Sequence, residues 1–314
     1  MIDSFLRRTR RLSTLAAALL ATAPALSAAQ TAAPAPVPVP ALVPATDADP
    51  ALWVVRDKDT TIYLFGTIHV LKPGLSWFDE AVKTAFDKSD TLVLEMVPPD
   101  QAAMRQLLVA RGFTASGPTL TEQLPEKDRA PYAAALGSVG LPAAAFDRAR
   151  PWVAATNLAL LPLMKLGYDP ASGPETVLAD AARAANKPVE GLETAAIQIG
   201  YLADLPQPVQ VQFLESTLKD FAKAGPMMAT MVGAWAKGDP ATLGRIMNDD
   251  VDDNPTLKRV LLTDRNVRWA QWIKARLARP GTVFVAVGAG HLAGADSVQD
   301  QLRKLKIKAM RVPY

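Results

Sequence analysis

Two strand-like segments near opposite ends of the chain finish in the same four-residue motif, and this pair constrains the fold more than any other feature. Residues 61–65 lead into Gly66-Thr67-Ile68-His69, and residues 282–287 lead into Gly288-Ala289-Gly290-His291. Both segments are apolar runs, which are typical of strands buried in a sheet. A sheet that contains both of them has to be assembled from the two ends of the chain.

The rest of the sequence divides into further strands close to these ends and a long helical region between them. Apolar and β-branched runs predict strands at 52–55, 91–97, 187–193 and 309–312. Between about 100 and 275, apolar residues recur at three- and four-residue spacings, which indicates helices. We therefore expect an α/β domain over residues 51–314, with a large helical insertion at about 100–275.

The first 29 residues have the organisation of a secretory signal peptide. Four arginines within 7–11 precede an apolar run at 15–21, and small residues follow at 27–29. This run is too short to span a bilayer, which needs about 20 apolar residues. We expect cleavage after residue 29, a periplasmic or secreted protein, and no membrane span in the mature chain. Residues 30–50, rich in Ala and Pro, are expected to form an extended linker that does not pack.

Composition excludes several kinds of site. The chain has 34 Lys and Arg and 31 Asp and Glu, of which the leader holds four Arg and one Asp, leaving 30 of each. A balanced charge does not favour a nucleic-acid or anionic-membrane partner. The chain has no cysteine, so disulfides, thiolate metal sites and cysteine nucleophiles are excluded.

The two histidines are the first candidates for a functional site. His69 and His291 are the only histidines, and each follows a glycine by three residues at the end of a predicted strand. Open α/β sheets place ligands at strand ends, where a glycine permits positive φ or a close backbone approach. Imidazole is the commonest protein metal ligand and the usual general base near neutral pH. If the two strands are neighbours, the rings converge; the alternative is two ordinary hydrogen-bonded histidines.

Three carboxylates and one arginine are candidates to complete such a site. A catalytic metal site usually has a third protein ligand, and Glu95 comes first because a carboxylate on an apolar strand needs a cleft, a cation or donors. Glu193, in the turn after the short internal strand, comes second, and Glu175 third; the alternative for each is a capping or solvated carboxylate. Arg265, followed by Asn266, could clamp a substrate carboxylate or steady an oxyanion, or lie on a solvated helix face.

Taken in order, the motifs resemble those of the TraB/GumN family, which includes the animal Tiki proteins. The resemblance rests on 63–69, Leu94-Glu95, Arg150-Pro151-Trp152, Lys187-Pro188-Val189, 191–194 with Gln198, Arg265-Asn266, and 284–292 with Gly294. It implies a three-layer α/β core related to the erythromycin-esterase and ChaN-like fold. The sheet would be mixed and formed by the N- and C-terminal parts of the chain. Pro174, ahead of Glu175, departs from the family pattern, in which a small aliphatic residue is more usual.

The resemblance also implies a function. Tiki proteins are similar and act as metal-dependent proteases through paired Gly-x-x-His motifs and glutamates. By that resemblance, the ligands of a divalent ion (Mn²⁺, Co²⁺ or Zn²⁺) are expected to be His69, His291 and Glu95. The catalytic residues are expected to be Glu95, Glu193, Arg265 and Asn266. The expected function is an exported metal-dependent hydrolase of peptides or small molecules. The alternative is a non-enzymatic protein that binds haem, a metal or a peptide, as the ChaN-like and pheromone-shutdown relatives suggest.

Overall fold

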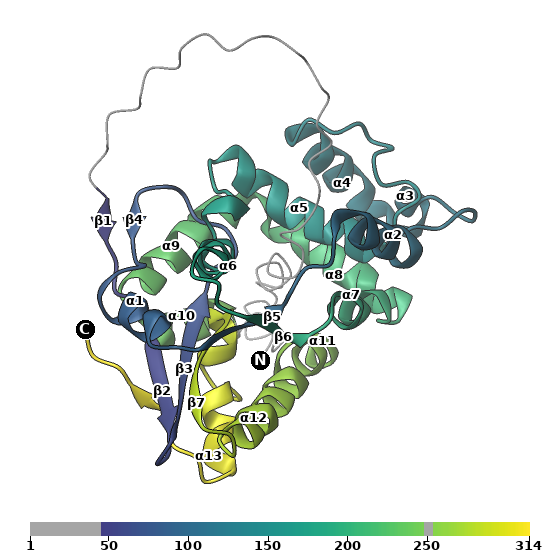
Figure 1. Ribbon diagram of the computed structural model, residues 1–314. Coiled ribbons are helices and arrows are strands. Elements are labelled where there is room, and N and C mark those ends of the chain that lie inside the picture. The colour runs from purple at the N-terminus through teal and green to yellow at the C-terminus, as the bar shows by residue number, and fades with distance from the viewer. Residues whose placement is uncertain (1–44, 248–253) are drawn as a thin grey trace, which may run out of the picture.

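Six strands from both ends of the chain and from its middle form one mixed sheet, in the order β6-β5-β7-β3-β2-β8 (Figure 1). The structure is a computed structural model that describes residues 45–247 and 254–314. The predicted signal peptide and residues 30–44 of the predicted linker lie outside the described residues. The strands are β1 (Thr46–Asp47), β2 (Leu52–Arg56), β3 (Thr60–Thr67), β4 (Leu75–Ser76), β5 (Thr91–Met96), β6 (Val189–Glu193), β7 (Gly281–Gly288) and β8 (Met310–Arg311).

The centre of the sheet is parallel, and it aligns the two glycine–histidine motifs. β7 lies between β3 and β5 and runs parallel to both, and β6 adds a parallel edge next to β5. β2 runs antiparallel to β3 and to β8 at the other edge. In the β3–β7 register, Thr67 is the partner of Gly288, so both motifs leave the same edge of the sheet at the same level. The predicted α/β fold is confirmed, and the helical region contributes the edge strand β6.

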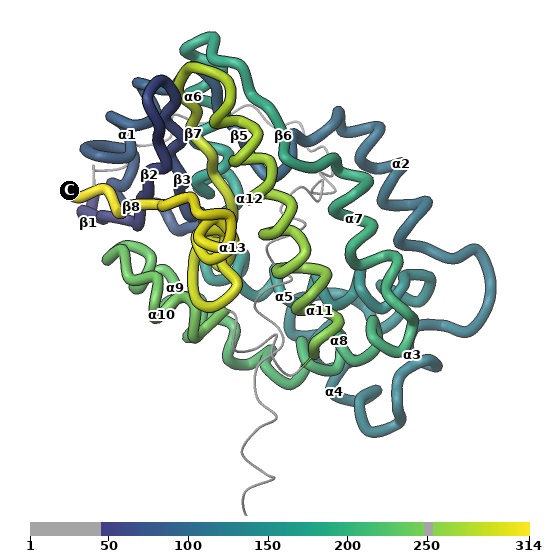
Figure 2. Tube along the Cα trace, turned by 90° about the horizontal axis from the view of Figure 1, so that it is seen from below, coloured from purple at the N-terminus to yellow at the C-terminus, as the bar shows by residue number. Residues whose placement is uncertain are grey.

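Most of the helices belong to the predicted helical region. α2 to α5, α7 and α8 gather on one side of the molecule, while α12 and α13 lie along the sheet (Figures 1 and 2). The helices are α1 (Glu80–Asp87), α2 (Gln101–Gly112), α3 (Leu120–Gln123), α4 (Glu126–Ser138), α5 (Pro151–Lys165), α6 (Pro174–Ala184), α7 (Ala195–Ala203), α8 (Gln207–Asp220), α9 (Ala224–Ala236), α10 (Pro240–Met247), α11 (Pro255–Lys258), α12 (Asp264–Arg276) and α13 (Val298–Lys304). The π-helical turn η4 (Arg259–Thr263) leads directly into α12.

Each face of the sheet has its own hydrophobic core. Along β7, Phe284 and Ala286 point into the larger core under the helical region, and Val283 and Val285 point into a smaller core that includes Trp269. Both sets are buried because successive side chains of a strand point to opposite faces. This double burial explains why β7 reads as a continuous apolar run, and it makes the domain three-layered.

The packed chain begins earlier than the sequence predicted. β1 pairs with β4, Ala48 is buried, and the amide of Asp49 donates a hydrogen bond to the carbonyl of Ala236. The prediction that residues 30–50 do not pack is therefore wrong for the last few of them. Composition suggested a linker up to residue 50, but these residues have partners far along the chain. Within the described residues, no helix has the length and apolar character to cross a membrane.

Candidate active site

The two Gly-x-x-His motifs converge because their glycines allow very close packing. A methyl group on Gly66 would lie 3.1 Å from the Cα of Ala289, and one on Gly288 would lie 3.2 Å from Oε1 of Glu95. Neither glycine has a positive φ, so close approach is the reason that the motif needs it. The methyl position on Gly288 is also 3.7 Å from Cδ2 of His291 and 3.9 Å from Nε2 of His69. Both histidines and Glu95 therefore surround Gly288.

His69 has one ring nitrogen fixed and the other free. Its Nδ1 lies 2.6 Å from Oε1 of Glu175, and the same oxygen accepts a hydrogen bond from Oγ1 of Thr67. Its Nε2 is buried and has no hydrogen-bond partner within the described residues. Burial opposes a charged imidazole, but the Glu175 carboxylate outweighs it and raises the pKa of His69. The carboxylate thus fixes the tautomer and leaves Nε2 available.

Glu175 reaches His69 because α6 begins against the backbone of the first motif. Glu175 lies in the first turn of α6, directly after Gly173 and Pro174. The backbone of Gly173 packs so closely on His69 that a methyl group there would lie 2.3 Å from the carbonyl oxygen of His69. The sequence placed Glu175 third among the carboxylates, although the structure makes it the partner of His69. Proline in the first turn marks the helix start, but the contact with His69 has no signal in the sequence.

This contact leads to a prediction about Gly173. We expect Gly173→Ala to lower the free energy of unfolding by about 1–3 kcal/mol, because the new methyl group has to push α6 away from the first motif. Gly233→Ala is the control, since Gly233 is exposed in α9 and a methyl group there meets nothing within 4 Å. We expect the control to stabilise the protein by about 0.5–1 kcal/mol. Urea unfolding measures both, and an equal effect of the two substitutions would contradict this reading of the contact.

Arg265, from the first turn of α12, joins the remaining site residues. Its Nε donates to both carboxylate oxygens of Glu193, at 3.1 and 3.2 Å. Its Nη1 donates to the carbonyl of Leu261 at 3.3 Å and lies 3.0 Å from Nε2 of His291. Its Nη2 donates to Glu95 at 2.5 Å and to Glu193 at 2.8 Å. A guanidinium has five N–H groups, and each of them has a partner within the protein.

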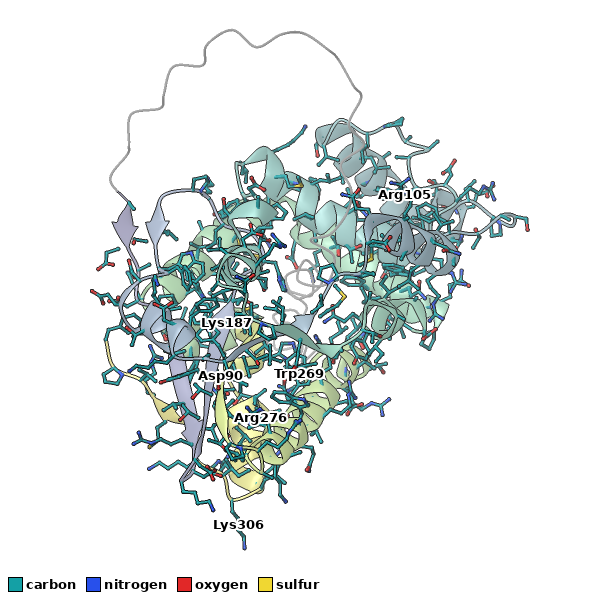
Figure 3. The ribbon with its side chains drawn as sticks, in the orientation of Figure 1. Asp90, Arg105, Lys187, Trp269, Arg276 and Lys306 are labelled. Carbon is teal, nitrogen blue, oxygen red and sulfur yellow. The ribbon has the colours of Figure 1, made fainter. Side chains whose placement is uncertain are left out.

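Two aromatic rings enclose this guanidinium. Its Cζ lies 4.6 Å from the ring centre of Trp269 and 5.3 Å from that of Tyr201, distances at which a cation is attracted to a ring. Trp269 also packs on His291, with 4.4 Å between ring centres, and in Figure 3 it lies where α12 approaches β5 and β6. The Arg265 side chain is only 3 % exposed. Packing and hydrogen bonds together hold it in one place.

Consecutive residues of α12 fix both nitrogens of His291. Nδ1 of His291 lies 2.6 Å from Oδ1 of Asn266, whose amide group donates to the carbonyl of Asp296. Because Asn266 uses Oδ1 toward the ring, His291 carries its proton on Nδ1, and Nε2 accepts from Arg265. Burial and then the charge of Arg265 lower the pKa of His291 to about 3. His291 is therefore neutral near pH 7 and has no free nitrogen.

Glu95 is ionised at the centre of the site. Burial alone would raise its pKa, but the charge of Arg265, the other nearby charges and a 2.7 Å hydrogen bond from the amide of Gly288 together outweigh burial, so that the pKa of Glu95 falls to about 2. Nε2 of Gln198 donates to Glu95 at 3.2 Å and to Glu193 at 3.1 Å. These donors satisfy a carboxylate that would otherwise be unstable on a buried strand.

Comparison with known proteins agrees with this arrangement of motifs. The profile of the TraB/PrgY/gumN family matches residues 51–311. The chain belongs to the TraB/PrgY/gumN family. It is 25% identical over 259 residues to the protein YbaP of Escherichia coli (strain K12), which covers 81% of this chain and 92% of YbaP. It is 23% identical over 276 residues to a Treponema pallidum (strain Nichols) protein, covering 81% of this chain and 80% of that protein. No solved structure matches the chain.

In this member of the TraB/PrgY/gumN family, a cavity of about 540 Å³ opens beside His69. Its lining includes His69, Glu95, Glu175 and Gln198, together with the end of β5 and one side of α6. Arg265, Glu193 and His291 do not belong to the lining that the described residues form. These three residues lie behind the cavity lining and contact the residues that form it. Of the described site residues that line the cavity, His69 is the one with a buried nitrogen that has no hydrogen-bond partner.

The structure brings every predicted site residue together and adds three. Gln198 was noticed only as part of the family pattern, and Tyr201 and Trp269 were missed. Tyr201 follows Gln198 by three residues on α7, and Trp269 follows Arg265 by four on α12, so each lies on the same helix face as a site residue. The three- and four-residue spacing from Gln198 and Arg265 is therefore a sequence signal by which Tyr201 and Trp269 could have been predicted. Tyr201 also donates from its hydroxyl to Glu193 at 2.8 Å.

As arranged, the site offers a metal ion few ligand atoms with a free lone pair. Within the described residues, no group of three or more His, Asp or Glu side chains is arranged to hold one. Of the three predicted ligands, His69 has a free nitrogen, whereas Nε2 of His291 and Oε2 of Glu95 are engaged by Arg265. The divalent ion stays a prediction of the family resemblance.

Proposed function

We propose that this TraB/PrgY/gumN-family protein is an exported hydrolase that acts in the cavity beside His69. The observation that carries the proposal is the state of the imidazole, which lines the cavity: Nδ1 is held by Glu175 at 2.6 Å, and Nε2 is buried and has no hydrogen-bond partner within the described residues. A histidine oriented by a carboxylate in this way is a general base or acid. Ordinary structural histidines use both nitrogens, as His291 does.

The reaction follows from that geometry. Neutral His69 takes a proton at Nε2 from a water molecule in the cavity, and the resulting hydroxide adds to a carbonyl carbon of the substrate. The charged imidazole then gives this proton to the leaving group as its bond to the carbonyl carbon breaks. Glu175 keeps the proton of Nδ1 in place and stabilises the charged ring in between. The products are an acid and an amine or alcohol.

The lining of the cavity favours a peptide-like substrate. One wall is apolar and comes from Leu94, Met96, Val97 and Pro98 at the end of β5. The volume of about 540 Å³ lies within the range of small-molecule and peptide pockets. An apolar side chain next to the scissile bond would lie on this wall, while the carbonyl faces His69. A haem held between both histidines has less support, because His291 has no nitrogen left for an axial bond.

A divalent ion is the remaining part of the expected function. Such an ion, when bound, supplies an activated water and polarises a carbonyl. The predicted ligands are not arranged to hold such an ion, because Arg265 contacts both His291 and Glu95. No step described above depends on an ion.

Blocking the cavity tests the proposal. Ala179 lines the cavity from α6, so we expect Ala179→Phe to lower kcat/KM about tenfold or more, the effect of losing roughly 1.4 kcal/mol of binding. Ala184→Phe, at the exposed end of the same helix, is the control and is expected to keep wild-type activity. The assay uses short peptides and p-nitrophenyl esters with the mature protein. If the wild type hydrolyses none of these substrates, or if both variants lose activity equally, the proposal is contradicted.

A further inference from the structure

The two carboxylates deepest in the site are balanced in charge without an added ion. Glu95 and Glu193 face the guanidinium groups of Arg265 and Arg268. Arg268 lies one turn after Arg265 on α12, and its Nη2 is 3.8 Å from Oε1 of Glu193. A metal site of carboxylates and imidazoles usually has an excess of negative charge that the ion neutralises. Here the neutralising charge belongs to the chain.

Arg265 contacts two of the three residues that were predicted to hold an ion. A metal held by the predicted ligands His291 and Glu95 has to contact Nε2 of the histidine and a carboxylate oxygen of the glutamate. Arg265 already contacts both, with Nη1 3.0 Å from Nε2 and Nη2 2.5 Å from Oε2. Nε2 of His291 has a single lone pair, so it cannot bind a metal ion while it accepts from the guanidinium. Moving the guanidinium aside would break its contacts with Glu193 and with two aromatic rings.

We propose that Arg265 is the resident cation of this site, occupies the place of the expected divalent ion, and lets the site work without one. The claim about catalysis rests on the proposed hydrolase function, and the claim about ion binding does not. Because every N–H of Arg265 has a partner and Arg265 is not part of the cavity lining, it neither clamps a substrate nor binds an oxyanion. Arg265 is a positioning residue that holds Glu95 and His291 behind His69.

Ion binding by the chelator-treated protein tests the first claim. MnCl₂, CoCl₂ and ZnCl₂ are titrated separately into the wild type, His69→Ala and Glu95→Gln, by calorimetry and by the midpoint of thermal unfolding. We expect the wild type to show no binding of one ion per chain that depends on these two residues. One ion per chain, bound by the wild type and lost in both variants, would overturn the proposal.

Removing the resident cation gives the converse test. Arg265→Met leaves Glu95 and Glu193 without their guanidinium, so we expect the folded variant to gain divalent-ion binding and a higher unfolding midpoint when Mn²⁺ is added. Lys274→Met is the control, because Lys274 is exposed on the same helix. A folded Arg265→Met that gains no binding would count against the proposal. If this variant does not fold, the wild-type titration decides.

Activity separates this inference from the proposed function. Hydrolysis that survives chelation of the wild type supports both. If hydrolysis is lost on chelation and returns when one divalent ion is added, the hydrolase function stands. The proposal that Arg265 replaces the ion is then overturned. If the wild type binds no ion and hydrolyses nothing, the proposed function fails, and with it the claim about catalysis, while the claim about ion binding stands.

Discussion

Arg265→Met is expected to lower the free energy of unfolding by about 3–5 kcal/mol, the usual effect of removing one partner from a buried ion pair. Two carboxylates, Glu95 and Glu193, would keep their places on the sheet but lose the cation that contacts both. Methionine fills a similar volume between the aromatic rings, so most of the loss is electrostatic. Urea unfolding at pH 7 measures it. Lys274→Met, on the exposed side of α12, is expected to change stability by less than about 0.5 kcal/mol.

The pH dependence of this loss identifies its cause. In the wild type the pKa of Glu95 is lowered to about 2, so Glu95 stabilises the fold above its unfolded pKa, and this contribution is lost as the pH falls toward 2. In Arg265→Met, Glu95 lacks its cation and takes up a proton at higher pH, so the deficit relative to wild type should shrink as the solution is acidified. Adding Glu95→Gln and Glu193→Gln to the variant should recover part of the stability. A deficit that is the same at pH 7 and pH 4 would instead indicate lost packing.

The sequence predicted those parts of the fold that short, local patterns determine. β3, β5 and β7 appear as apolar runs because helices cover both faces of the sheet. The convergence of His69 and His291 needed only one condition, that their strands be neighbours, and the parallel pairing of β3 with β7 satisfies it. The motif glycines are explained by close packing, which was one of the two reasons given for them.

The electrostatics of the site could not be predicted, because they depend on contacts between distant segments. A charged helix residue is usually solvated, and nothing local shows that Arg265 faces β5 and β6 and is enclosed by Tyr201 and Trp269. Glu175 was ranked below Glu193, and no local pattern shows its contact with His69, which lies more than a hundred residues away. The sequence therefore identified which residues meet but not which of them keep a free lone pair. That distinction separates a metal ligand from a general base.

His69→Ala is expected to lower kcat by about 10²–10⁴-fold, the usual contribution of a general acid or base. The fold should lose about 1–3 kcal/mol, because the hydrogen bond to Glu175 and the packing of a mostly buried ring both disappear. Free imidazole should restore part of the activity of His69→Ala, because the cavity can admit it beside Glu175. It should not restore activity to Arg265→Met, whose defect lies behind the cavity. Unchanged hydrolysis in His69→Ala would make this histidine structural.

The pH profile shows in which direction His69 transfers its proton. A general base has to be neutral, so the rate should rise with pH as His69 loses its proton, at a pKa that Glu175 holds above the ordinary value. Glu175→Gln removes that charge while an oxygen can still accept from Nδ1, so the rising limb should move to lower pH. A metal-bound water as the nucleophile would instead give a limb that disappears on chelation and shifts with the identity of the added ion. The two origins of the nucleophile are therefore distinguished by profiles measured after chelation and with each added ion.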